Sequence, residues 1–205
     1  MQEAWIKLIN KYSSLKEVFV ECEETDPELK TNIQPLNEFR AALDHVMRMM
    51  YLYYLNSSEY DWHEEFRKLN SHLDRAFFDV CDMLSINYRN KIIDSVEIYT
   101  TETIRTVLPK YYPEWKIKIE DISNRVIKYR NRKTGYSRDE TFQNYKDDIF
   151  ALRDIYNEIN SKRTILEKIE NDNRKKNITA NRLEYIAYGS FITAIIGIIL
   201  ALHPC

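Results

Sequence analysis

Residues 142–166 read FQNYKDDIFALRDIYNEINSKRTIL, and this stretch decides the fold. Its large side chains recur in alternating steps of three and four residues, the spacing of one face of an α-helix. These positions are Phe142, Tyr145, Ile149, Leu152, Tyr156, Ile159, Arg163 and Leu166. The preceding SRDE places Ser137 three residues before Glu140, as in a capping box. We therefore expect a long helix from Ser137 that packs either inside a bundle or between copies in a parallel coiled coil.

The rest of the chain has the composition of a helical protein. Its 205 residues include only 3 glycines and 5 prolines, against 30 basic and 32 acidic residues. Few turn formers and many charges favour long helices over strands. The formal charge of -2 excludes a globally basic protein, so any binding of anions needs a local basic patch. The sequence thus predicts an all-α fold.

Several further helices are marked by stripes of apolar side chains. The first lies in residues 1–20, and later ones lie in residues 62–84, 92–107 and 115–129. Pro109 ends the third of these helices. A helix that starts at Pro35 is expected to bury a stripe formed by Leu36, Phe39, Leu43, Met47, Met50 and Tyr54.

The chain closes on YIAYGSFITAIIGIILALHPC, residues 185–205, which has no Asp, Glu, Lys or Arg. Tyr185 to Leu202 would form about 27 Å of helix, close to the roughly 30 Å of a bilayer's hydrocarbon core. Basic residues such as Arg174, Lys175 and Lys176 lie before this stretch and none follows it. The sequence therefore predicts a single-pass membrane protein with its N-terminal domain in the cytoplasm. The alternative is a buried C-terminal core helix.

Small residues form a stripe along the same tail. Their spacing would let tail helices approach closely in a membrane, or line a pore formed by several copies. The positions are Gly189, Ser190, Thr193, Ala194, Gly197 and Ala201. A homo-oligomer is therefore expected, and a plain anchor is the alternative.

These features divide the chain into three segments. Residues 1–136 are expected to form a cytoplasmic helical bundle. Residues 137–182 would form a long amphipathic stalk helix with a basic juxtamembrane part, and residues 183–205 a transmembrane helix with a short tail.

A basic segment with interleaved tyrosines is the predicted ligand site. Such a cluster can hold phosphates while an aromatic ring stacks on a base. It comprises Arg125, Lys128, Tyr129, Arg130, Arg132, Lys133, Tyr136 and Arg138. The alternative is a solvated loop.

Arg40 and His45 have the R-x4-H spacing and resemble the motif of HEPN ribonucleases. The resemblance implies a histidine in acid/base chemistry and an arginine that steadies phosphate, with two copies of the motif meeting at a dimer interface. Ala41 stands where such motifs often place a polar residue, and the motif lies early in the chain. A structural role is the preferred interpretation, so no catalytic residue, metal site or cofactor is predicted.

The arrangement of a helical domain before one apolar tail resembles the small membrane effector of bacterial Hailong-type anti-phage systems. The resemblance implies an oligomeric, channel-forming effector of the bacterial inner membrane in antiviral defence. It also implies a cognate nucleotidyltransferase as partner, whose oligonucleotide product would be sensed by the helical domain. The alternatives are a membrane-tethered HEPN-like ribonuclease and a non-enzymatic tail-anchored adaptor.

Overall fold

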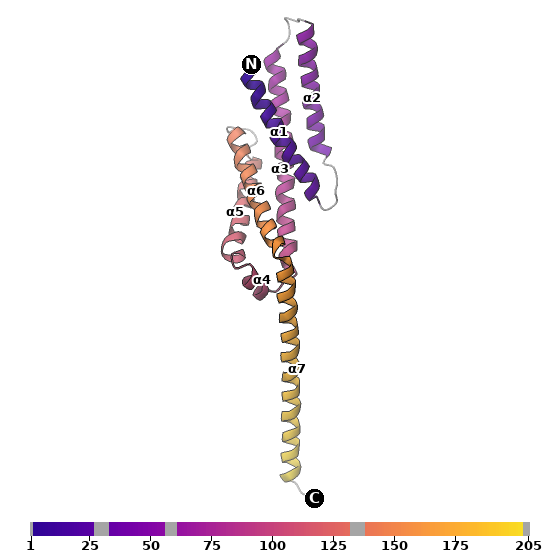
Figure 1. Cartoon of the computed structure of the whole chain (residues 1–205), viewed down its shortest axis with the longest axis vertical. Coiled ribbons are helices and arrows are strands. Elements are labelled where there is room, and N and C mark those ends of the chain that lie inside the picture. The colour runs from indigo at the N-terminus through magenta and orange to yellow at the C-terminus, as the bar shows by residue number, and fades with distance from the viewer. Residues whose placement is uncertain (1, 27–32, 56–60, 132–137, 203–205) are drawn as a thin grey trace.

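The computed structural model describes residues 2–26, 33–55, 61–131 and 138–202, without the side chains of residues 130, 131, 138, 139, 194 and 196–202. Throughout these ranges the protein is all-α, as predicted. The helices are α1 (Gln2–Thr25), α2 (Ile33–Tyr54), α3 (Trp62–Glu97), α4 (Thr101–Val107), α5 (Lys116–Asn131), α6 (Arg138–Ser161) and α7 (Arg163–Leu202), with a π-helical turn, η1, at Tyr111–Trp115. Figure 1 shows an elongated bundle from which α7 projects at one end.

Helix α3 is the axis of the bundle. It has 36 residues, which corresponds to about 54 Å, and α1, α2 and α6 all pack along it. Its start is fixed by Asp61, whose carboxylate accepts hydrogen bonds from the backbone N–H groups of His63 (2.9 Å) and Glu64 (3.2 Å). This N-cap satisfies donors that the first turn of a helix leaves unpaired.

The stripe in residues 142–166 packs inside the chain. Tyr145, Ile149 and Leu152 of α6 are buried, and Tyr145 donates a hydrogen bond to Asp82 of α3. Of the two packing modes left open by the sequence, the structure has the intramolecular one. The expected long helix is divided, because α6 ends at Ser161 and α7 begins at Arg163.

The stripes predicted in residues 62–84 and 92–107 also divide differently. Residues 62–97 form one continuous helix, and the break comes only between Ile98 and Thr100. Thr100 begins α4 by accepting a hydrogen bond from the backbone N–H of Thr103. A side-chain cap, more than the apolar spacing, therefore sets this boundary.

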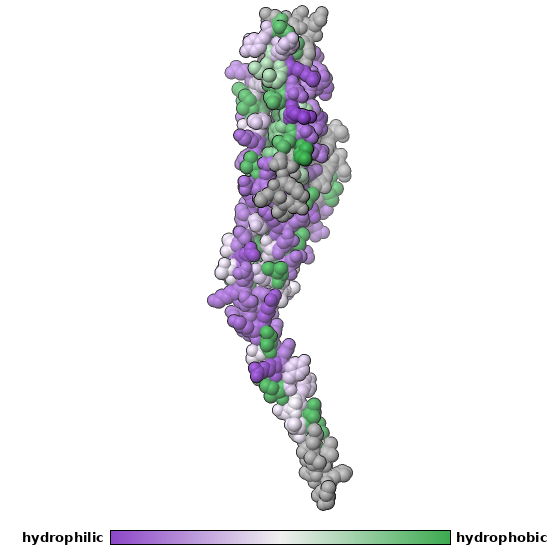
Figure 2. Space-filling model, turned by 90° about the vertical axis from the view of Figure 1, so that its right-hand side faces the viewer, coloured by the Kyte–Doolittle hydropathy of each residue, from purple (hydrophilic) through white to green (hydrophobic). Residues whose placement is uncertain are grey.

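Helix α2 presents a different face to the bundle from the one that its stripe predicts. Ala42, His45 and Met49 are buried, whereas Leu43 and Met47 are each 57% exposed. Figure 2 shows hydrophobic residues on the surface of the upper part of the molecule, where α1 and α2 lie. The apolar stripe of α2 is thus largely a surface feature.

The predicted transmembrane helix needs a correction. Among the residues whose side chains the structure describes, no helix contains an 18-residue stretch apolar enough to cross a membrane. The physical reason lies in α7, where every such stretch that ends by Ile195 includes polar residues before Tyr185, among them Arg182 and Glu184. The predicted fold class is therefore wrong in its membrane-spanning part, and a single-pass inner-membrane location is not supported.

Candidate functional site

Arg40 and His45, the two residues of the R-x4-H motif on α2, do not contact each other. His45 is 8% exposed and faces α3, whereas Arg40 is exposed and lines a groove between α1 and α2. The five-residue spacing turns the helix by about 140° beyond a full turn, so the two side chains leave it in different directions. His45 instead meets residues of α3.

The helix α3 carries a second copy of the motif that contains His45. Residues 38–45 read EFRAALDH and residues 65–72 read EFRKLNSH, so both share the pattern E-F-R-x4-H. The two copies lie on neighbouring helices that are joined as a hairpin and run in opposite directions (Figure 1). This arrangement brings the glutamate of each copy to the histidine of the other.

The pairing between the copies is reciprocal. Nδ1 of His45 lies 2.5 Å from Oε2 of Glu65, and Nδ1 of His72 lies 2.7 Å from Oε2 of Glu38. The two imidazole rings stack with centroids 5.2 Å apart and planes 29° from parallel. Because an ionised carboxylate only accepts hydrogen bonds, Nδ1 of His45 carries the proton of its bond to Glu65.

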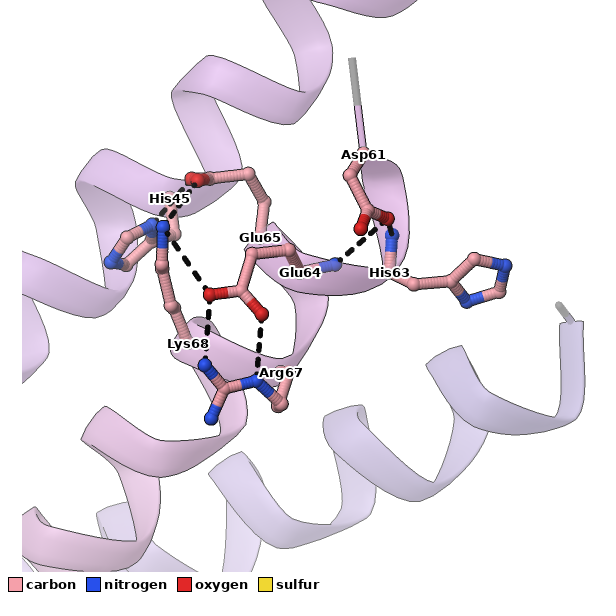
Figure 3. Close-up of polar contacts among 7 residues, drawn as sticks. All are labelled: His45, Asp61, His63, Glu64, Glu65, Arg67 and Lys68. Carbon is pink, nitrogen blue, oxygen red and sulfur yellow. Dashed lines mark hydrogen bonds and ion pairs between the residues drawn. The ribbon is translucent and has the colours of Figure 1, made fainter.

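Cations complete the cluster on both sides. Nζ of Lys68 donates to Oε1 of Glu65 at 3.3 Å, as Figure 3 shows. Arg75 donates to Glu38 at 2.9 Å and lies 2.6 Å from Nδ1 of His72. A guanidinium only donates hydrogen bonds and an ionised carboxylate only accepts them. Nδ1 of His72 can therefore accept a hydrogen bond from Arg75 or donate one to Glu38, but it cannot do both at once.

The neighbouring side chains at the start of α3 are surface ion pairs. Arg67 forms two hydrogen bonds of 2.8 Å to Glu64, which lower the pKa of the Glu64 carboxyl (Figure 3). His63 points away from this cluster (Figure 3). Exposed pairs of this kind contribute little to stability.

The cluster has the parts of a proton-transfer site and also those of a structural core. A carboxylate at Nδ1 orients an imidazole and leaves Nε2 for acid/base work. The same bonds satisfy polar groups buried between α2 and α3, where His45 and Glu65 are 8% and 4% exposed. The repeat is visible in the sequence when residues 38–45 are aligned with residues 65–72, although only the first copy was predicted as a motif.

Part of the predicted basic site is already engaged inside the chain. Arg125 donates to both carboxylate oxygens of Asp148, at 2.9 and 2.7 Å, and Tyr129 donates to the same group at 3.1 Å. The bond to Asp148 raises the pKa of Arg125, and burial raises that of Tyr129. Lys128 is exposed. The remaining predicted residues, Arg130, Arg132, Lys133, Tyr136 and Arg138, lie outside the described residues or side chains.

Gly189, Ser190 and Thr193 of the predicted small-residue stripe lie on the exposed outer part of α7. A Cβ atom at Gly189 would meet nothing within 4 Å. Ser190 and Thr193 donate to backbone carbonyls one turn earlier, at 2.9 and 3.1 Å. The side chains of Ala194, Gly197 and Ala201 fall outside the description, so the predicted stripe stays a prediction.

Comparisons with protein families, curated proteins and solved structures find no match for this chain. The fold and the site therefore define only a class: an elongated all-α protein with a paired histidine cluster and a projecting C-terminal helix. Within the described residues, no group of three or more His, Cys, Asp or Glu side chains is arranged to hold a metal ion.

Proposed function

We propose that this protein is a non-enzymatic homo-oligomer that assembles through the projecting part of α7. The observation that supports this most is a row of exposed residues on that helix. They alternate in steps of three and four and comprise Ile178, Asn181, Tyr185, Tyr188, Ile192 and Ile195. Such a row is the contact seam of a coiled coil, and a polar Asn within it is a common means of fixing register.

The surroundings of the seam support the same proposal. The contacts of α7 with the bundle are near its start, where Asn173 donates to Thr103 at 3.1 Å. Beyond that point Tyr185, Tyr188 and Ile192 are 79%, 60% and 56% exposed. A lone helix in water is marginal even with good helix formers, and association would bury these side chains.

The role of the bundle in this proposal is to receive a signal. The basic segment of residues 125–138, which begins within α5, remains the proposed docking surface for a nucleotide or oligonucleotide, with Lys128 as its exposed described member. We propose no membrane pore, because the described residues contain no helix apolar enough to cross a membrane.

Sedimentation velocity of the full chain tests assembly. The double variant Tyr188→Glu, Ile192→Glu places charges in the seam and should convert the oligomer to a monomer. The matched control is Ala187→Glu, Ser190→Glu, which adds the same charge off the seam and should stay oligomeric. A monomeric wild type at tens of micromolar, or dissociation of both variants, contradicts the proposal.

The repeated motif favours one second candidate, metal-independent cleavage of RNA by His45 and His72. Two carboxylate-oriented histidines could act as general base and general acid, with Arg75 beside them to hold phosphate. In that case two copies of the motif would meet within one chain.

Incubation of RNA with the protein in EDTA tests this candidate. His45→Asn and His72→Asn should each abolish cleavage, and His63→Asn, at an exposed position outside the cluster, should retain it. If the wild type leaves RNA intact, or if all three variants cleave it, the histidine pair is structural.

A further inference from the structure

An apolar groove runs between α1 and α2 above α3. Both helices pack chiefly on α3, so a valley remains between them. Buried Ala42, Leu69 and Leu73 line it, together with side chains such as Ile9 and Leu36. Its volume is about 590 Å³. Small-molecule sites are typically apolar clefts of roughly 300–1,000 Å³ with a few polar groups, so the groove is large enough for such a ligand.

Aromatic contacts limit what can occupy this groove. Phe39 of α2 meets Tyr12 and Phe19 of α1 edge-on, with ring centroids 6.1 and 5.5 Å apart. These contacts tie the two walls together. An α-helix is about 10 Å across, so a partner helix could enter only by breaking them. A single hydrocarbon chain is much thinner and can lie along the groove, which extends about 16 Å between Leu8 and Phe19.

The charged groups that line the groove are both cations. Lys16 and Arg40 line it and are exposed, and neither forms an ion pair with another described residue. Two of the neighbouring acids are engaged elsewhere, since Glu17 pairs with Lys146 and Glu38 with Arg75. An apolar groove lined by two cations, neither of them in an ion pair with a described residue, matches a ligand that has an apolar chain and an anionic head.

We propose that this groove binds a fatty acid, with its hydrocarbon chain over Leu69 and Leu73 and its carboxylate at Lys16 and Arg40. The apolar lining would supply most of the affinity, because the hydrophobic effect scales with buried area. The two cations would select the sign of the head group. Neither the proposed assembly through α7 nor the histidine cluster is needed for this binding.

Isothermal titration calorimetry with dodecanoate, below its micelle concentration, tests the site. Wild type should bind dodecanoate at least tenfold more tightly than dodecyltrimethylammonium, which has the same chain and the opposite charge. Lys16→Glu, Arg40→Glu should weaken dodecanoate about tenfold and remove or reverse the preference. Both residues are exposed, so thermal unfolding should be nearly unchanged.

A matched control separates the groove from general charge. Lys7→Glu, Arg48→Glu reverses two exposed cations on the same helices outside the groove lining and should bind dodecanoate like wild type. No binding by wild type, equal affinity for the two surfactants, or equal loss in both double variants overturns the proposal. So does a finding that Leu36→Glu dissociates an oligomer, since a second copy would then fill the groove.

Discussion

Glu170 is one of the residues that fasten α7 to the rest of the protein. Its Oε2 accepts hydrogen bonds from the backbone N–H of Thr100 (3.0 Å) and from the Thr100 hydroxyl (2.9 Å), and Arg174 donates to Oε1 at 3.2 Å. The side chain is 4% exposed. The backbone bond from Thr100 is the largest cause that lowers the pKa of Glu170, from 4.5 to about 2. One carboxylate thus links the start of α4 to α7.

This pKa predicts a dependence of stability on pH. A carboxyl whose pKa is lowered by folding contributes its full stabilisation above pH 4.5 and loses it as the pH falls towards about 2. Glu170→Gln should therefore cost about 1–2 kcal/mol of unfolding free energy at pH 7, with the difference from wild type disappearing towards pH 2. Urea unfolding at several pH values measures this.

Glu167→Gln is the control for that experiment. Glu167 pairs with Arg163 at 3.1 Å on the surface of the same helix, and both side chains are more than half exposed. Its loss should change stability by no more than about 0.5 kcal/mol. A Glu170 variant that keeps wild-type stability and its pH dependence would show that the carboxylate does not hold α7.

The sequence could not reveal contacts of this kind. Glu170 and Thr100 are 70 residues apart, and nothing in their local sequence distinguishes them from other acids and hydroxyls. The pairing of Glu38 with His72 has a visible signal in the repeated motif, yet it also requires the hairpin of α2 and α3. Residue identities indicate which groups can bond, whereas the fold decides which groups meet.

At the scale of elements, α2 shows the limit of apolar periodicity. Two rows of side chains on this helix have helical spacing, and the more apolar one, with Leu43 and Met47, is the exposed one. The buried row contains His45, whose polar groups are satisfied by Glu65. Periodicity predicted the helix correctly but selected the wrong face. Polar residues in a sequence usually indicate an exposed face, so a row that buries a polar pair is taken for a surface row.

Two identical substitutions on α2 test which face is buried. Met49 is 1% exposed and Met47 is 57% exposed. Met49→Ala should lower the unfolding free energy by about 2–5 kcal/mol because it leaves a cavity, and Met47→Ala should change it by about 0.5 kcal/mol or less. Chemical denaturation of both variants measures the difference. The reverse order of costs would restore the face that the sequence predicts.

At the scale of the whole molecule, composition predicted the all-α class because glycine and proline are scarce. The apolar end of the sequence also predicted a membrane span, which the described part of the chain does not support. Length and charge counts describe a stretch in isolation, whereas α7 is one helix that joins the polar residues before Tyr185 to the apolar ones after it. The seam on its outer part became visible only when the exposed positions were known.

The described contacts of α7 with the bundle lie near its start, so the outer part of this helix is a lever arm. From Glu170 to Ile195 it extends about 37 Å beyond its fastening. A tilt of about 10° at Thr100 and Glu170 would therefore sweep the far end through roughly 6 Å, more than a full turn of helix. Small strains at α4 are amplified mechanically at the tip, and the stiffness of the contacts made by Glu170 and Asn173 sets how much torque the arm can transmit.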